Sequence, residues 1–321
     1  MTGELHSLII YVLFGYSLLY PAALLCLRIF SIENPRQRLQ IYLLALVIPP
    51  AGFVLYHTLL TKRCQAPPYS LAGGETLHLL CYHSTNLLGL FMLLLGVLTV
   101  LVILKAAAAW LLIARLRARI VTPAGDLLRR IETTLRTRCL SMDISQPELI
   151  LSSKPGYSAF TAGLVRPVLV LNIGLADQLT DCELDILITH ELVHIKKRDT
   201  LKGWLLQLLK NLTFINPLSH MLLERFFLER ECLCDRSALK LTGLSAQTYA
   251  AALLKVWRLQ LNEKSLRPWT ASFFSGRSRE MEYRIGSLIK REAHNRMAPL
   301  PFYALLISLL TGSIIFLGLI C

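Results

Sequence analysis

Two histidines and a glutamate in the stretch His190-Glu191-Leu192-Val193-His194 have the types and the spacing of a metal site. On a helix, residues four apart share a face, so His190 and His194 can offer two imidazoles to one Zn²⁺. Glu191 would then stand beside the ion without binding it, where its carboxylate can serve as the general base of a hydrolase. The pattern therefore predicts a zinc site, provided that a helix carries it and that a third ligand exists.

The helix is indicated by Thr180 and Glu183, which form a capping-box signature at the start of residues 182–197. No proline or glycine interrupts this run. Just after it, Asp199 is a candidate for orienting one of the ligand histidines. A charge at the end of a basic helix explains Asp199 equally well.

A second predicted helix offers the third ligand. Asn216-Pro217 is typical of a helix start, with asparagine as the N-cap and proline at the first helical position. Glu231 and Asp235 lie four apart on this helix, so Glu231 can bind zinc while Asp235 orients a histidine. Glu229 is a competing ligand, but no carboxylate follows it four residues later.

These motifs together resemble the membrane zinc peptidases of the BlaR/MecR antirepressor type, which are gluzincins. The resemblance rests on the HExxH motif with Asp199, the run Phe214-Ile215-Asn216-Pro217-Leu218, and the pattern Glu231-x-x-Cys234-Asp235. Residues 158–163 and 166–171 also look like that family's segment ahead of the zinc helix, so the likeness covers about residues 150 to 290. It favours Glu231 over Glu229, which falls outside the matched pattern.

The resemblance also implies a function. Such enzymes receive an outside signal through their membrane helices and cleave a cytoplasmic repressor, and often themselves. Antirepressors that sense penicillins carry a C-terminal penicillin-binding sensor domain, whereas this sequence stops at Cys321. We therefore do not expect β-lactam sensing by this chain itself.

The composition agrees with a membrane protein, because 54% of the 321 residues are hydrophobic. Apolar runs predict transmembrane helices at about residues 6–30, 39–60, 87–114 and 298–321. Arginines follow the first and third runs at positions 28, 36, 38, 115, 117 and 119. By the positive-inside tendency, the N-terminus lies outside a bacterial inner membrane, and residues 115–297 lie in the cytoplasm.

The predicted fold is mainly α, with four transmembrane helices and a cytoplasmic α+β gluzincin-like domain inserted between the third and the fourth. In that domain, residues 123–140 read as an amphipathic helix, and residues 147–151 and 165–172 as strands. The strand near Val168 is a candidate edge for binding extended substrate, or else a simple support for the zinc helix. A basic segment, Ser272–Lys290, is expected to be flexible and is a candidate self-cleavage site.

The net charge of +13 does not indicate nucleic-acid binding, because 28 of the 34 lysines and arginines lie between Arg115 and Arg296 without a DNA-binding motif. A domain facing anionic lipid explains that bias. Cys232 and Cys234 have no second cysteine pair with which to form a thiolate zinc site. Cys64 and Cys81 fall in an expected outer loop, where a disulfide is one option.

The sequence thus predicts an integral-membrane zinc endopeptidase that cleaves a protein such as a helix-turn-helix repressor, itself, or both. The alternatives are an HtpX-like quality-control protease and a non-catalytic signalling scaffold. An intact Glu191 argues against the scaffold. The oligomeric state stays open.

Overall fold

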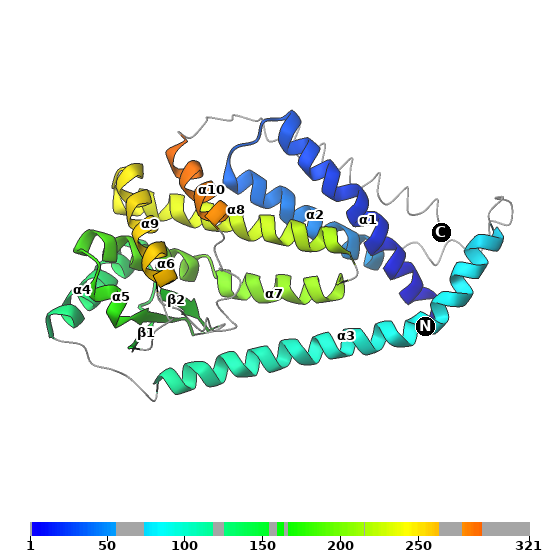
Figure 1. Ribbon diagram of the computed structural model, residues 1–321, viewed down its shortest axis with the longest axis horizontal. Coiled ribbons are helices and arrows are strands. Elements are labelled where there is room, and N and C mark those ends of the chain that lie inside the picture. The colour runs from blue at the N-terminus through cyan, green and yellow to red at the C-terminus, as the bar shows by residue number, and fades with distance from the viewer. Residues whose placement is uncertain are drawn as a thin grey trace. The chain divides into compact units, whose positions relative to one another are not determined.

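The computed structural model of the chain describes residues 2–55, 74–117, 125–153, 159–163, 166–214, 216–262 and 278–290. These residues are mainly helical, as the sequence predicts (Figure 1). They fall into two compact units. The first contains Met1–Val100 and Leu208–Glu229, and the second contains Leu101–Gln207 and Arg230–Arg291.

The helices and strands follow one another along the chain in this order. The first four helices are α1 (Thr2–Ile29), α2 (Pro35–Leu55), α3 (Gly74–Arg117) and α4 (Gly125–Met142). The strands are β1 (Glu148–Ser152), β2 (Ala159–Ala162) and β3 (Val168–Asn172). The remaining helices are α5 (Ile173–Asp177), α6 (Asp181–Lys196), α7 (Asp199–Leu212), α8 (Pro217–Thr242), α9 (Ala246–Asn262) and α10 (Ser278–Ile289).

In the first unit, α1 and α2 pack against each other, and a proline shapes their contact. Pro50 lies inside α2 and has no N–H group, so the carbonyl of Leu46, four residues earlier, receives no hydrogen bond from it. The Tyr16 hydroxyl of α1 donates to that carbonyl at 2.7 Å. Gly15 allows α1 to approach α2 closely at this point, because a Cβ on residue 15 would stand 2.9 Å from the Cβ of Pro49. The neighbouring helix thus satisfies an acceptor that proline leaves open.

Two stretches of the described residues are long and apolar enough to cross a membrane, Val12–Ile29 in α1 and Gly96–Arg117 in α3. The third helix begins earlier than expected, since residues 74–86 were predicted to be a loop and are helical. No proline or glycine follows Gly74 until Gly89, so nothing in this run ends the helix. The expected fourth span and Cys64 lie outside the described residues.

The second unit contains a three-stranded sheet in the order β1-β3-β2. Strand β3 pairs in parallel with β1 and in antiparallel with β2, and all five of its residues are buried. The expectation that the strand near Val168 forms a free edge is therefore wrong. Val168 pairs with Glu148 on one side and Ala162 on the other. Strand β2, which was not predicted from the sequence, is instead an edge strand of this sheet, and it packs against α6.

Helix α6, which carries the HExxH motif, is held at its start and along its side. Thr180 is its N-cap, and its hydroxyl oxygen accepts from the Glu183 N–H while the Glu183 carboxylate accepts from the Thr180 N–H. The predicted capping box is thus confirmed. Arg138 of α4 forms a bidentate pair with Asp185 and donates to the carbonyl of Leu241 in α8 at 2.7 Å. These contacts join three helices around the motif.

Replacing Thr180 with alanine should lower the stability of the second unit. Loss of an N-cap costs about 1 kcal/mol, which corresponds to a fall of roughly 2–4 °C in the unfolding midpoint of a domain of this size. Thr134→Ala is the matched control, because the Thr134 hydroxyl bonds to the carbonyl of Arg130 inside α4 and caps nothing. Thermal unfolding in detergent should separate the two variants. Equal midpoints would show that the cap contributes nothing.

Helix α8, which carries the predicted third ligand, begins as the sequence predicts. The Asn216 side-chain oxygen accepts from the Leu218 N–H at 2.9 Å, and Pro217 is the first helical residue. The Asn216 amide also donates to the carbonyls of Val12 and Leu13 in α1, at 3.1 Å each. Asn216 therefore caps α8 and also joins α8 to α1 by hydrogen bonds.

The segment Ser272–Lys290, expected to be flexible, contains helix α10 from Ser278 to Ile289. The pattern of Met281, Ile285 and Leu288 is that of an amphipathic helix, and Met281 and Leu288 are buried. Helix α10 packs against α9. The expectation of a flexible tail is therefore wrong for residues 278–289, and residues 272–277 lie outside the described part of the chain.

Candidate metal centre

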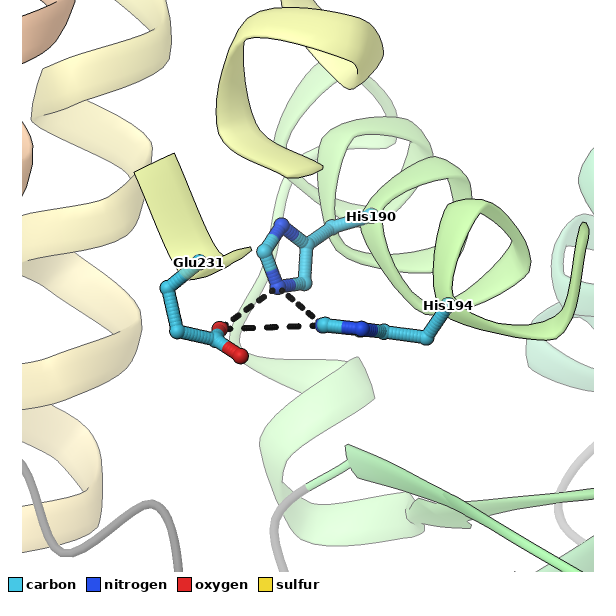
Figure 2. Close-up of side chains that lie close together, drawn as sticks. All are labelled: His190, His194 and Glu231. Carbon is cyan, nitrogen blue, oxygen red and sulfur yellow. Dashed lines mark hydrogen bonds and ion pairs between the residues drawn. The ribbon is translucent and has the colours of Figure 1, made fainter. Parts of the chain in front are cut away.

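Three side chains from two helices converge on one point (Figure 2). The Nε2 atoms of His190 and His194 lie 3.1 Å apart, and Glu231 Oε2 lies 3.5 Å and 3.6 Å from them. Ligands held tetrahedrally at 2.0–2.1 Å from zinc are roughly 3.3 Å from one another. All three residues are buried. The predicted ligand set is therefore brought together at spacings that suit a zinc ion.

Each histidine turns its other ring nitrogen toward an acid. Nδ1 of His194 lies 2.8 Å from Asp199 Oδ2, and Nδ1 of His190 lies 3.0 Å from Asp235 Oδ1. An Nδ1–H that donates to a carboxylate leaves the Nε2 lone pair free. Two such lone pairs and a carboxylate oxygen facing one another would repel unless a cation lay between them. This arrangement is the observation that best fits a metal.

Asp199 reaches His194 because the chain turns sharply between α6 and α7. Arg198 has a φ of 53°, the left-handed region, and α7 begins at the next residue. Of the two explanations that the sequence left open for Asp199, the contact with His194 matches the orienting one. That role, like the role of Asp235, stays a prediction about function.

Glu191 is 9% exposed and lies within the electrostatic reach of both histidines. Without a bound cation, burial raises the pKa of its carboxyl above the ordinary value, against the lowering effect of His194 and His190. A carboxyl group with a raised pKa is better suited to accept and return a proton near neutral pH than an exposed one.

The competing ligand Glu229 is engaged elsewhere. Its carboxylate lies 2.6 Å from Nε of Arg38, at the start of α2, and only 3% of the residue is exposed. Both residues belong to the first unit, whereas the candidate ligands belong to the second. The structure therefore pairs Glu229 with an arginine and places Glu231 with the histidines.

Cys234 offers a second grouping that could hold a metal, together with His194 and Asp199. Its sulfur lies 3.5 Å from His194 Nδ1 and 3.4 Å from Asp199 Oδ2. Burial raises the pKa of this thiol, so it stays protonated and is a poor ligand. The Lys197 ammonium is also 3.7 Å from the sulfur. Hydrogen bonding explains this second cluster better than a cation does.

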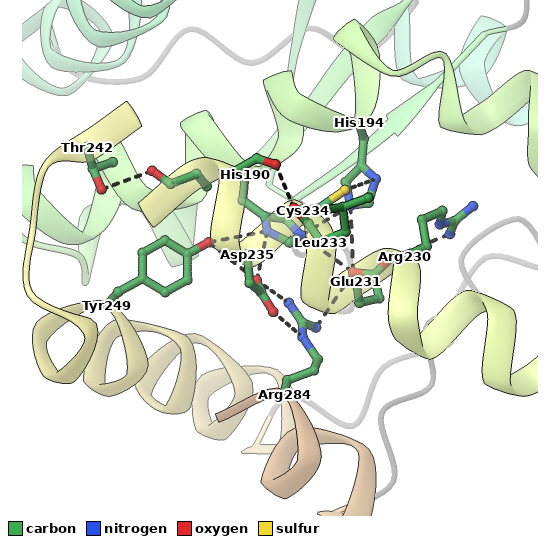
Figure 3. Close-up of polar contacts among 12 residues, drawn as sticks. His190, His194, Arg230, Glu231, Leu233, Cys234, Asp235, Thr242, Tyr249 and Arg284 are labelled. Atoms are coloured by element: carbon green, nitrogen blue, oxygen red, sulfur yellow. Dashed lines mark hydrogen bonds and ion pairs between the residues drawn. The ribbon is translucent and has the colours of Figure 1, made fainter. Parts of the chain in front are cut away.

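Two residues that the sequence analysis missed complete the surroundings of Asp235 (Figure 3). Arg284 of α10 donates from Nε to Asp235 Oδ2 and from Nη2 to Oδ1, at 2.7 Å each. The Tyr249 hydroxyl of α9 lies 3.3 Å from Asp235 Oδ1 and 3.4 Å from His190 Nδ1. The sequence did hold one signal, since two buried acids on α8 require a nearby cation.

The pKa values of the histidines predict how zinc binding depends on pH. Burial acts to lower the pKa of both. The hydrogen bonds that His190 donates to the Asp235 and Glu231 carboxylates raise the pKa of His190, and Cys234, Glu231 and Asp199 raise the pKa of His194 well above 6.5. A proton on Nε2 occupies the lone pair that zinc needs, so zinc affinity should fall as the pH drops through these raised values. We expect about a tenfold loss per pH unit for each displaced proton.

A competition titration with a chelator at several pH values measures this dependence. The loss should already be under way above pH 6.5, the ordinary value for histidine. A zinc affinity that stays constant from slightly alkaline to slightly acidic pH would contradict the assignment of the two histidines as ligands.

Replacing Asp199 with asparagine should weaken zinc binding without unfolding the chain. The amide is of similar size but cannot stabilise the Nδ1–H form of His194 by charge. Loss of such a partner costs roughly 10–100-fold in metal affinity. Asp177→Asn is the matched control, because Asp177 is an exposed residue at the end of α5 and is not part of the candidate metal centre. An Asp199→Asn variant with unchanged zinc affinity would leave Asp199 as no more than a helix-end charge.

Comparison with known proteins agrees with this geometry. Residues 80–286 match the family model described as BlaR1 peptidase M56. The chain is 31% identical to Regulatory protein BlaR1 of Bacillus licheniformis over 144 residues, 44% of this chain and 24% of that protein. It is 28% identical to Protease HtpX of Photorhabdus laumondii subsp. laumondii over 104 residues, 32% of this chain and 35% of that protein. The matched part thus spans a quarter to about a third of these relatives.

Proposed function

Because the chain belongs to the M56 peptidase family and is a BlaR1-type membrane metallopeptidase, we propose that it is a zinc endopeptidase whose site is formed by His190, His194 and Glu231. The single observation that carries the proposal is the convergence of three lone-pair donors on one buried point. The two acids behind the histidines support zinc in particular, since imidazole and carboxylate ligands with hydrogen-bonded outer partners are typical of catalytic zinc.

A zinc ion held by His190, His194 and Glu231 would supply Lewis acidity, for water activation and for polarising a peptide carbonyl. The chain's own residues do the rest. Glu191 accepts the proton of the attacking water on a carboxylate oxygen and later delivers it to the leaving nitrogen. Asp199 and Asp235 keep the two imidazoles in the Nδ1–H form during this cycle.

Strand β2 replaces the strand near Val168 as the proposed binding edge for substrate. It lies at the margin of the sheet and packs against the zinc helix, α6. An extended peptide could add to that margin through main-chain hydrogen bonds. Gly163 follows β2 with a φ of 88°, and a Cβ there would stand 2.2 Å from the Arg166 carbonyl oxygen, so this position requires glycine.

The membrane arrangement is part of the same proposal. We place four transmembrane helices in a bacterial inner membrane with the N-terminus outside, and residues 115–297 as a peptidase domain in the cytoplasm. The apolar windows of α1 and α3 and the arginines Arg115 and Arg117 at the end of α3 support this orientation. A site in the cytoplasm would meet a transcriptional repressor or the chain's own peptide segments.

The substrate we propose is a helix-turn-helix repressor, with or without cleavage of the chain itself. The match to Regulatory protein BlaR1 favours this class. The match to Protease HtpX supports a protease in general. A second candidate function is therefore the quality-control proteolysis of membrane proteins that the sequence analysis gave as an alternative. A non-catalytic scaffold is the third alternative, and a buried Glu191 beside the two histidines argues against it.

The test is to express the full chain and its Glu191→Ala variant in membranes with a candidate repressor, and to follow both proteins by immunoblotting. Cleavage by the wild type alone supports the proposal. Cleavage of a misfolded membrane protein in place of the repressor would favour the quality-control function. Equal processing by both forms would leave only the scaffold.

A further inference from the structure

Arg284 is a largely but not fully buried cation that the reaction described above does not use. Its side chain is 16% exposed, and it forms two hydrogen bonds with Asp235, which is fully buried. Asp235 in turn contacts Nδ1 of His190. Figure 3 shows the three side chains in line, from α10 through α8 to the zinc helix.

The two bonds fix the Asp235 carboxylate in one plane. A bidentate guanidinium contact sets the orientation of a carboxylate as well as its charge, whereas a single contact leaves it free to rotate. The Tyr249 hydroxyl adds a contact to Oδ1, the oxygen that also faces His190. Without Arg284, the buried carboxylate would lose its charge partner and the two contacts that set its orientation.

We propose that Arg284 is a positioning residue of the metal centre: it holds Asp235 in the orientation that keeps His190 ready to bind zinc. The metal centre is therefore complete only when α10 is docked on α9. This inference rests on the proposed zinc site, and it assigns to α10 a function that neither the HExxH motif nor the ExxCD motif contains.

Electrostatics alone predicts the opposite sign, which makes the inference testable. Arg284 Nη1 lies 3.7 Å from Glu231 Oε2, so the guanidinium repels a cation bound by Glu231. If Arg284 acted only by charge, its removal would tighten zinc binding. If it acts through Asp235, its removal loosens zinc binding.

The experiment compares full-length Arg284→Gln and Arg284→Lys with the wild type in detergent, by zinc competition with a chelator and by the visible spectrum of the Co²⁺-substituted protein. We expect Arg284→Gln to bind zinc about 10–100-fold more weakly. Arg284→Lys should lie between, since an ammonium keeps the charge but not the paired contact. Arg279→Gln, an exposed position on the same helix, is the matched control and should bind as the wild type does.

A second set of variants guards against simple misfolding. Asp235→Asn removes the group through which Arg284 acts, so adding Arg284→Gln to it should cost little further affinity. The double variant also leaves no buried unpaired charge. Additive losses, or tighter zinc binding in Arg284→Gln, would overturn the inference. If every Arg284 variant kept wild-type zinc affinity while Glu191-dependent cleavage persisted, only this inference would fail, whereas a wild-type chain without zinc would overturn the proposed function as well.

Discussion

Replacing Glu191 with glutamine is expected to slow peptide hydrolysis by a factor of about 10²–10⁴ while leaving zinc in place. Glutamine has nearly the same shape, but its amide cannot accept the proton of the attacking water. The three metal ligands are untouched, so the zinc content should equal that of the wild type. Initial rates on a cleavable substrate, divided by the zinc content of each preparation, measure the effect.

The same variant should not be less stable, which separates a loss of chemistry from a loss of structure. Burial raises the pKa of Glu191 above its ordinary value, so in the metal-free protein its charged form weakens the fold at neutral pH. A neutral glutamine removes that cost, and the unfolding midpoint of chelator-treated protein should stay level or rise. Glu132→Gln, an exposed change on α4, controls for the loss of one carboxylate. Unchanged hydrolysis in Glu191→Gln would end the proposed mechanism.

Replacing Glu231 with glutamine is expected to reduce bound zinc below one ion per chain. This change removes one of three protein ligands, and even the loss of an outer hydrogen-bonding partner costs roughly 10–100-fold in affinity, so the loss here should be larger. Activity should fall in proportion to zinc and recover only in part with added metal. Elemental analysis after dialysis measures the zinc content.

Glu229→Gln is the informative comparison for Glu231, because it lies two positions earlier on the same helix. Its carboxylate pairs with Arg38 and lies outside the metal centre, so zinc content should not change even if stability falls. Loss of zinc in Glu229→Gln with retention in Glu231→Gln would reverse the ligand assignment.

The ligand geometry follows from local rules, which is why much of it could be anticipated. His190 and His194 share a face because helical periodicity places them there, and a capping box at Thr180 indicated where that helix begins. Asn216 likewise announced the start of α8, four turns before Glu231. Helix caps and helical spacing depend only on residues close together in the sequence, so they can be predicted from it.

Contacts between distant segments were harder to foresee. Arg284 lies forty-nine residues beyond Asp235, in a stretch whose arginines and glycines suggested an open tail. Strand β2 has only four residues, Ala159–Ala162, and owes its conformation to pairing with β3. The position of Val168 in the sheet could not be predicted either. A buried apolar strand has the same sequence pattern whether it lies in the middle or at the edge of a sheet, and only the pairing order distinguishes the two.

The Tyr16–Leu46 contact bears on how the first two helices can be arranged. Pro50, four residues after Leu46, lacks the N–H group that would normally donate to this carbonyl, and the Tyr16 hydroxyl of the facing helix donates in its place. Sliding α1 along α2 by a single turn would take the Tyr16 hydroxyl away from the Leu46 carbonyl and leave that acceptor without this donor. Pro50 thus favours one position of α1 along α2, the position at which the Tyr16 hydroxyl reaches the Leu46 carbonyl, and disfavours positions shifted by a turn.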